Sequence, residues 1–280
     1  MTDKKYKSFL DEYIIAELND GIRLLDLAED SNLHQTVHAL RKSMKRIRGW
    51  LRSVRPEANA KSYNRELSGI GKEISNLRDS TSAIESLDRI RDRYGSWLNE
   101  DILHLFETEL IEYRSKITET NRPTLMRVRA RLAALRNKYE AFEVSGYPDL
   151  LHGIQQTYID AREAFREISK NKDSETFHEW RKRTKDLQNQ MLFFPDDIPF
   201  FNKIHVGFDE LAGFLGNDQD LYLLEAALSN SALPEDAKDL LSALISYEHH
   251  NLQQDALRIG NELFDKTPKI FISQIAAAMN

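Results

Sequence analysis

Two strings of basic residues, placed half a chain apart, have the composition of an anion-binding site. His38 to Lys45 and His178 to Lys185 both read H-x-x-R-K-x-x-K, at an offset of 140 residues in a chain of 280. Arginine forks and lysine ammonium groups bind phosphate oxygens through charge-assisted hydrogen bonds, and an imidazole can donate another. The recurrence indicates an internal duplication in which two equivalent segments bind the same kind of anion.

The first string lies beside an apolar stripe with helical period. Apolar residues from Leu33 to Val54 recur at alternating steps of four and three, and the residue after each of them is basic. One residue is about 100° of helical rotation, so a cationic ridge runs next to the buried seam. Seven Arg and Lys residues but no Asp or Glu lie between positions 31 and 55. The ridge comprises His34, His38, Arg41, Lys45, Arg48, Arg52 and Arg55, and Lys42 and Arg46 flank it.

The length of this ridge favours a long polyanion as its ligand. From His38 to Arg55 it covers roughly 25 Å at about 1.5 Å per residue, which is more than one phosphate group needs. Like charges at helical spacing destabilise a helix, and no acidic residue within the ridge relieves them. Either carboxylates of other helices or an external anion must therefore do so.

In the second string only the first two turns keep their charge. We therefore expect the N-terminal half to contribute more of the binding free energy, with Arg162 on the preceding helix as a further candidate in the second half. The residues that follow the apolar positions of this string are His178, Arg181, Lys185, Gln188 and Leu192.

The candidates also have purely structural interpretations. His38 and His178 can be packing histidines that hydrogen-bond to a neighbour, and the basic residues can form a solvated helix face. Arg78 can pair at a helix end instead of binding a ligand. The recurrence of the string and its lack of acidic residues favour binding. We interpret three nearby carboxylates as caps of the helices that follow them, namely Asp79, Asp218 and Asp220.

Helices must hold these residues in place. Only 11 glycines and 7 prolines interrupt the chain, and no convincing period-two alternation occurs. We therefore expect an all-α protein with two domains, residues 1–145 and 146–280, divided at the break that contains Gly146 and Pro148. A capping box at Ser82 and Glu85 predicts the start of one helix, and a break at Asn121 to Pro123 precedes another. Further helices are predicted over 33–54, 63–77, 149–169, 175–194, 199–215, 218–230 and from 235 onward.

The composition argues against several classes of protein and site. A net charge of −6 argues against a uniformly basic protein that coats nucleic acid, so any polyanion site must be local. The absence of cysteine removes disulfides, thiolate nucleophiles and cysteine-bound metal. Neither a signal peptide nor a run of 18 apolar residues is present, so we expect a cytoplasmic protein that does not span a membrane.

The paired strings resemble those of the CHAD domain family, which is named for its conserved histidines and α-helical content. Each of its two repeats has a His-x-x-Arg-Lys/Val-x-x-Lys/Arg helix followed by a segment similar to LGxxRD. The resemblance covers nearly the whole chain, although Ser75 and Gln219 depart from the second pattern. The matching residues are His38, Arg41, Lys42, Lys45, Arg46, Arg48, Arg78 and Asp79 in the first repeat, and His178, Arg181, Lys182, Lys185, Leu215, Gly216 and Asp220 in the second.

The resemblance implies two four-helix bundles related by internal duplication and pseudo-two-fold symmetry, with a basic central groove or channel that binds inorganic polyphosphate. The chain lacks the Glu-x-Glu-x-Lys signature of the CYTH enzyme that often accompanies such domains, so it is similar to a stand-alone, non-enzymatic member. Its expected location is cytoplasmic, with polyphosphate granules as one candidate place. The predicted binding residues are His38, Arg41, Lys42, Lys45, Arg46, Arg48, Arg52, Arg78, Arg162, His178, Arg181, Lys182 and Lys185.

Two other functions remain open at this point. An enzyme acting on polyphosphate or nucleotide phosphates would use the cations to stabilise a transition state, but no P-loop, acidic metal cage or pair of catalytic carboxylates adjoins the strings. A nucleic-acid-binding protein would need a basic and aromatic surface pattern, which is absent. We expect inorganic polyphosphate as the partner, with no cofactor and no metal ion, and protein partners cannot be identified from the sequence.

Overall fold

The computed structural model describes residues 3–54, 58–139 and 147–279, and all regular structure within those ranges is helical. The all-α prediction is confirmed. The elements are α1 (Asp3–Asp26), α2 (Leu33–Ser53), α3 (Ala58–Glu73), α4 (Ser75–Tyr94), the short 3₁₀ helix η1 (Gly95–Trp97), α5 (Glu100–Asn137), α6 (Tyr147–Ile168), α7 (Ser174–Met191), α8 (Pro199–Ser229), α9 (Glu235–Leu263) and α10 (Pro268–Ala278).

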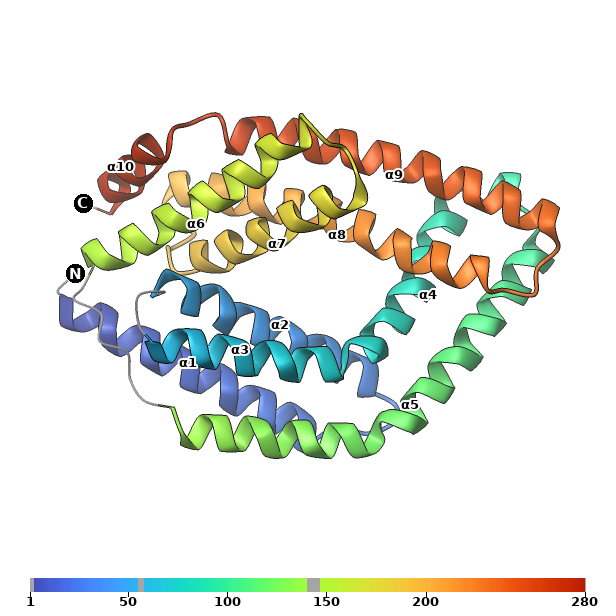
Figure 1. Cartoon of the computed structure of the whole chain (residues 1–280), viewed down its shortest axis with the longest axis horizontal. Helices are drawn as coiled ribbons and strands as arrows, with labels where there is room; N and C mark the ends of the chain where they lie inside the picture. The colour runs from blue at the N-terminus through green and yellow to red at the C-terminus, as the bar shows by residue number, and fades with distance from the viewer. Residues whose placement is uncertain (1–2, 55–57, 140–146, 280) are drawn as a thin grey trace.

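The two helices that carry the basic strings lie side by side at the centre of the molecule. α2 packs against α7, and Figure 1 shows this pair with α1 and α3 on one side and α6 and α8 on the other. The apolar stripe predicted for 33–54 is the buried face of α2, where Val37, Leu40 and Ile47 are at most 1% exposed. In α7, Phe177 and Trp180 are buried in the same way. The residue after each buried one therefore lies at the edge of the α2–α7 interface.

A close approach at Gly49 and hydrogen bonds from side-chain amides of α7 to backbone carbonyls of α2 fix how the two helices cross. At Gly49 the helices approach so closely that a Cβ atom would lie 2.8 Å from the Cβ of Asn189. The amide Nε2 of Gln190 donates to the carbonyl of Gly49 at 2.8 Å, and Nδ2 of Asn189 donates to the carbonyl of Lys45 at 3.2 Å. Buried hydrogen bonds of this kind are costly to leave unmade, so they hold one register of the two helices.

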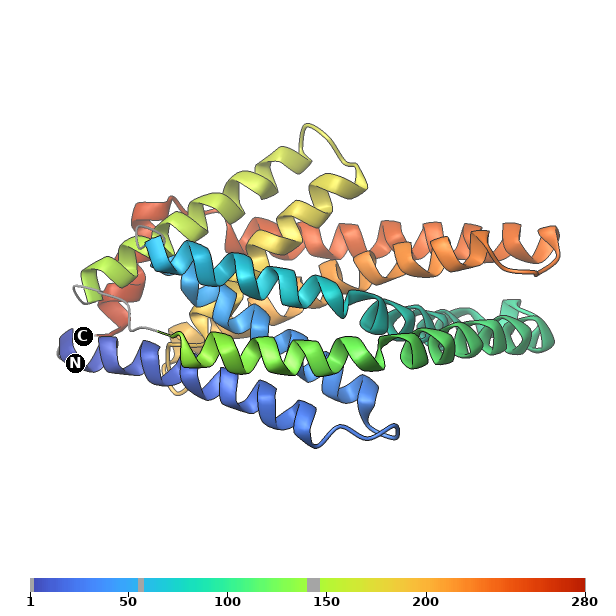
Figure 2. The same ribbon diagram turned by 60° about the horizontal axis from the view of Figure 1, so that its bottom comes forward.

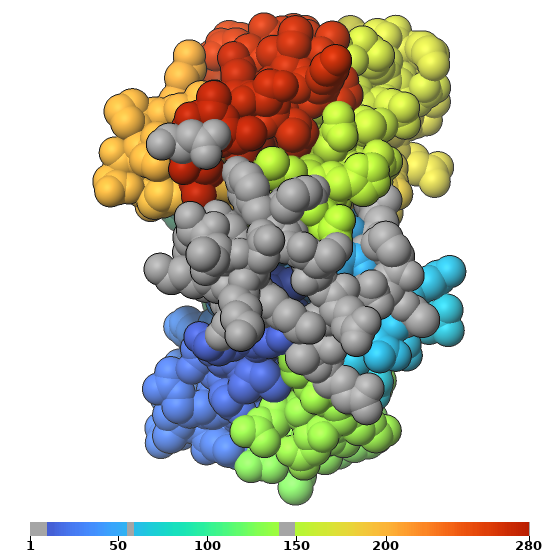
Figure 3. Space-filling model, turned by 90° about the vertical axis from the view of Figure 1, so that its left-hand side faces the viewer, coloured from blue at the N-terminus to red at the C-terminus, as the bar shows by residue number. Residues whose placement is uncertain are grey.

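Two apolar cores stabilise the fold, and each combines residues of both halves of the chain. The larger core joins α1, α2 and α3 to α6, α7 and the first part of α8. The smaller core is formed by α4, α5, α8 and α9, which extend to one end of the molecule in Figures 1 and 2. At the opposite end, Figure 3 shows α10 and α6 in one half of the view and α1 and α5 in the other. The two halves thus bury common cores and not separate ones.

The break that the sequence predicts at Asn121 to Pro123 is wrong. Pro123 lies inside α5, a helix of 38 residues, and Nδ2 of Asn121 donates to the carbonyl of Ile117 at 2.8 Å. Proline removes one backbone donor and bends a helix without always ending it. Figure 1 shows α5 changing direction along its length, so the bend replaces the predicted end.

Two more predicted helix starts are wrong. α4 begins at Ser75, so Ser82 is a buried residue within the helix and not its cap, and the apolar series of 63–77 is divided between α3 and α4. α8 continues through the gap predicted between 215 and 218, because Leu215 and Leu221 on either side are both buried in apolar cores. Tertiary packing outweighs the low helix propensity of Gly216.

The first half of the central break predicted at residues 144–149 lies outside the described residues, which omit 140–146, and α6 begins at Tyr147. Arg55 of the predicted ridge also lies outside them. No helix in the described part of the chain has an apolar stretch long enough to cross a bilayer.

Candidate anion-binding site

Two adjoining cavities of about 350 and 450 Å³ lie against the α2–α7 pair, and we refer to them together as the central cavity. One of them continues toward α3, and the other continues toward α4 and α8. Both motif helices therefore face one shared space. Five residues line both cavities, namely Arg41, Lys45, His178, Arg181 and Lys185.

The side of the central cavity toward α3 adds more cations of the predicted ridge. Arg48 donates from Nε to the side-chain oxygen of Asn64 at 3.0 Å, and Arg52 forms an ion pair with Asp186 of α7. Lys72 of α3 also lines this side, and its position in the sequence gave no signal of that. A neutral amide and one carboxylate therefore face several cations here.

The opposite side of the central cavity carries more acidic residues. His38, Lys42 and Arg78 line it together with Asp79 and Asp220. Arg78 pairs with Glu85 at 2.8 Å and lies 3.7 Å from the Asp220 carboxylate. The side-chain pairing considered for Arg78 in the sequence thus occurs, while the guanidinium still borders the cavity.

The carboxylates near the strings are not helix caps, contrary to the sequence prediction. Asp79 lies within α4, and Asp218 and Asp220 lie within α8. Oδ1 of Asp218 is 2.8 Å from Nδ1 of the buried His249. Burial raises the pKa of the Asp79 carboxyl, against the attraction of Arg41. Asp218 thus holds His249 and Asp220 lies near Arg78, instead of capping the start of a helix.

The cations shared by both cavities have few partners of opposite charge. Lys45 and Arg181 form no ion pair and donate no side-chain hydrogen bond to any residue that the structure describes. Arg41 donates to the carbonyl of Gly71 at 2.6 Å, and Lys185 donates to the side chain of Gln188 at 2.8 Å. Partial burial without neutralising partners leaves these groups available to an external anion.

The titration of these groups reflects both their burial and their mutual repulsion. Burial, followed by the charges of Arg181 and Arg41, lowers the pKa of Lys45 to about 7. Burial and then Arg181 lower the pKa of Lys185 to about 8. The pKa values of Arg41 and Arg181 are also lowered, mainly by burial. A bound anion would oppose each of these shifts.

The pKa values of the two histidines that open the strings are lowered, which favours their neutral form. Burial and then the charge of Arg78 lower the pKa of His38, and burial and then Lys182 lower that of His178. Nδ1 of His178 is hydrogen-bonded to the side-chain oxygen of Gln219, the residue that departs from the LGxxRD pattern. The neutral imidazole of His178 donates its one N–H to Gln219 and has none left for phosphate, whereas His38 makes no such hydrogen bond to a described residue.

The structure does not bring two of the predicted residues to the central cavity. Arg46 points to α1, where its Nε lies 2.5 Å from a carboxylate oxygen of Glu17. Arg162 donates from Nε to the carbonyl of Phe264 at 2.9 Å and so binds the end of α9. Neither residue lines a cavity that the strings also line. Arg46 is rotated by one residue relative to Lys45 and faces α1, and Arg162 of α6 faces the end of α9. Lys182, in contrast, lines the α3 side of the central cavity.

The arrangement can hold anions but shows no described metal site. No group of three or more His, Asp and Glu side chains with metal-binding geometry occurs among the described residues. The converging arginine and lysine side chains are suited to hydrogen-bond several phosphate groups at once.

Comparisons with known proteins agree on the fold. The CHAD domain profile matches residues 24–229. PptA from Streptomyces chartreusis has a TM-score of 0.66 at 14% sequence identity, over 93% of this chain and 99% of that one. The crystal structure of the CHAD domain from the plant Ricinus communis has a TM-score of 0.56 at 15% identity, over 90% of this chain and 91% of that one. A search of curated proteins found no match.

Proposed function

The chain belongs to the CHAD domain family, and from the residues of its central cavity we propose that it binds inorganic polyphosphate and does not hydrolyse it. One observation carries this proposal. Arg41 and Lys45 of α2 and Arg181 and Lys185 of α7 line a common space, and none of the four forms an ion pair with a carboxylate of the described residues.

The proposed binding mode is multidentate. Arginine forks and lysine ammonium groups contact successive phosphates, while cations released from the polymer make the affinity fall with added salt, by analogy with nucleic-acid phosphates. Each further phosphate meets another side chain until the cavity is filled, so affinity increases with chain length. Orthophosphate makes only one such contact and binds weakly.

We also infer that the two halves arose by duplication and that their motif helices form a basic groove with pseudo-two-fold symmetry. The same string in α2 and α7, and their packing against each other, support this inference. A cytoplasmic location, including polyphosphate granules, is part of the same proposal.

Titration with polyphosphate of several lengths, and with orthophosphate, tests the proposal at two salt concentrations. Two double variants, Arg41→Ala/Lys45→Ala and Arg181→Ala/Lys185→Ala, should each weaken binding of long chains about a hundredfold, because each removes two charge-assisted contacts. The exposed pair Lys203→Ala/Lys269→Ala changes the charge equally and should leave affinity within about twofold, since exposed charges act weakly.

Equal affinity of the wild-type protein for orthophosphate and long polyphosphate would refute the proposal. Phosphate release from polyphosphate in the presence of Mg²⁺, lost in the Arg41→Ala variant, would assign an enzyme instead. Displacement of polyphosphate by an equal concentration of single-stranded RNA would assign a nucleic-acid-binding protein.

A further inference from the structure

A third cavity, of about 760 Å³, adjoins the central cavity between α2, α4 and α5, and we name it the outer cavity. His38 and Arg78 line both the outer cavity and the part of the central cavity near α4. His34, the first residue of the ridge, lies in the outer cavity. The ridge on α2 therefore passes from one cavity to the next along the helix.

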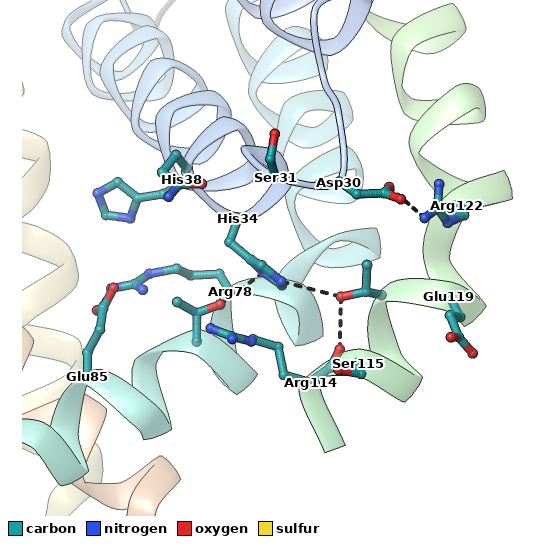
Figure 4. A pocket seen from close by; sticks show the side chains of 13 residues that line it. Asp30, Ser31, His34, His38, Arg78, Glu85, Arg114, Ser115, Glu119 and Arg122 are labelled. Carbon is teal, nitrogen blue, oxygen red and sulfur yellow. Dashed lines mark hydrogen bonds and ion pairs between the residues drawn. The ribbon is translucent and has the colours of Figure 1, made fainter. Parts of the chain in front are cut away.

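One cation of the outer cavity comes from outside both strings. Arg114 of α5 lines the cavity, and its guanidinium forms no ion pair or hydrogen bond within the described ranges. Figure 4 shows Arg114 extending from α5 toward the side of the cavity where Arg78 lies. Its charge contributes, after burial, to the lowered pKa of His34. Arg114 and His34 are therefore close neighbours.

Most carboxylates of the outer cavity are already paired or directed elsewhere. Asp30 pairs with Arg122 at 2.5 Å, and Glu85 pairs with Arg78 at 2.8 Å. Glu119 points away from the histidine side of the cavity in Figure 4. Of the arginines that line the outer cavity, Arg114 is therefore the one that forms no ion pair with a carboxylate of the described residues.

Neutral polar side chains line one wall of the outer cavity and are hydrogen-bonded to one another and to backbone carbonyls. His34 is held by the hydroxyl groups of Thr81, at 3.1 Å from Nδ1, and of Thr118, at 3.4 Å from Nε2. The first turn of α2 contains no acidic residue, and Asn32 before it makes no side-chain capping hydrogen bond to the helix. The positive end of the helix dipole thus reinforces the charge of this wall.

The second neighbour of the central cavity has the opposite character. A cavity of about 680 Å³ between α6 and α7 shares His178 and Lys182 with the central cavity. It is lined by the carboxylates of Asp160, Glu163, Glu167, Glu175 and Glu179, against the cations Lys182 and Arg183. A polyanion that extends beyond the central cavity is repelled on this side.

We propose that a long polyphosphate chain leaves the central cavity past His38 and Arg78 into the outer cavity, where Arg114 binds it and His34 lines its path. This inference rests on the proposed function, because it extends the same binding site. It assigns to α5 a binding residue that neither basic string contains. It also gives the site a direction, since the carboxylate-lined cavity at the α6–α7 side excludes the chain.

Chain length separates the outer cavity from the central one in an experiment. Binding of tripolyphosphate and of long polyphosphate is measured by titration for the wild-type protein, Arg114→Ala and Lys45→Ala/Arg181→Ala. Lys116→Ala is the matched control, because this exposed lysine lies two residues along the same helix and lines no described cavity. Circular dichroism and thermal melting confirm that each variant is folded.

The Arg114→Ala variant should bind long polyphosphate about threefold to fivefold more weakly at low salt, as one partly exposed charge contact predicts. The slope of log affinity against log salt should fall by about 0.7 to 0.9, the value for one phosphate contact in nucleic acids. Tripolyphosphate affinity should stay unchanged in Arg114→Ala and fall in Lys45→Ala/Arg181→Ala.

Each other outcome overturns a defined part of the argument. If Arg114→Ala and Lys116→Ala bind long polyphosphate equally while Lys45→Ala/Arg181→Ala loses binding, the outer path is wrong and the proposed function stands. If Arg114→Ala weakens tripolyphosphate as much as the long chain, Arg114 does not act on an outer segment. If the wild-type protein binds neither polymer, the proposed function itself fails.

Discussion

Binding of polyphosphate should raise the protonation of Lys45 and Lys185, and this makes pH the sharpest test of the central cavity. In the free protein the pKa values of these lysines are lowered to about 7 and about 8. The groups around Lys45 are Arg41 on its own helix, Arg181 and Lys185 on α7, and Asp220 on α8. Burial, and then three cations against one carboxylate, disfavour the charged form of Lys45 until an external anion enters.

The size of the effect follows from these pKa values. At pH 8 a group with a pKa of about 7 is about one-tenth protonated and one with a pKa of about 8 is half protonated, so restoring both takes up about 1.4 protons. At pH 6 both lysines are already charged and uptake is close to zero. Affinity should therefore fall about twentyfold from pH 6 to pH 8 if the bound-state pKa values exceed 9.

Isothermal titration calorimetry in buffers of different ionisation enthalpy counts the protons directly. The Lys45→Arg variant is the control, because it keeps the positive charge and removes the main group that titrates. Only Lys185 then contributes, and the fall in affinity between pH 6 and pH 8 should shrink to about twofold. Long polyphosphate is the suitable ligand, since its few terminal groups add little titration of their own.

Two results would refute this reasoning. Proton uptake near zero at pH 8, with tight binding, would mean that the phosphates do not approach the lysines. The same pH dependence in Lys45→Arg as in the wild-type protein would mean that other groups, on the protein or the ligand, control it.

Three further predictions concern stability. Because the pKa of Lys45 is lowered, the free folded protein binds fewer protons than the unfolded chain between pH 7 and 10.5, so its stability should increase with pH across that window. The Lys45→Met variant should stabilise the free protein at pH 7 by about 1–2 kcal/mol in urea unfolding while weakening polyphosphate binding. Destabilisation by this variant would contradict the prediction. Arg46→Ala should cost about 2 kcal/mol, because it leaves the buried Glu17 without its cation, yet keep polyphosphate affinity; a large loss of affinity would return Arg46 to the site. Gly153→Ala should cost about 2 kcal/mol or more in the same unfolding assay, because its Cβ would lie 1.9 Å from the carbonyl oxygen of Ser53, and an unchanged midpoint would show that α6 can shift.

The helical elements were predictable where apolar spacing was regular, and their boundaries were not. The stripe from Leu33 to Val54 gave α2 to within one residue, because burial of one face both selects the helix and fixes its length. Pro123 and Gly216 were misinterpreted as breaks, because local propensity is weaker than the packing of a long helix against a core.

Some of the proposed binding residues were likewise predictable from the sequence, and one was not. The string spacing placed Arg41, Lys45, Arg181 and Lys185 beside buried seams, and the structure brings all four to one cavity. The spacing could not show that Arg114 of α5 lines the adjoining outer cavity, since that residue is distant in sequence and belongs to no repeat.

Periodicity along the chain is enough to establish that the chain is helical and that cations follow the buried faces of the two helices that carry the basic strings, because helical rotation relates each position to the next. Which of these cations is neutralised depends on how the helices pack against one another. Arg46 meets Glu17 of α1, whereas Lys45, one residue earlier, meets other cations. A carboxylate's distance from a cation depends on how separate helices pack, and no periodicity within one helix contains that information.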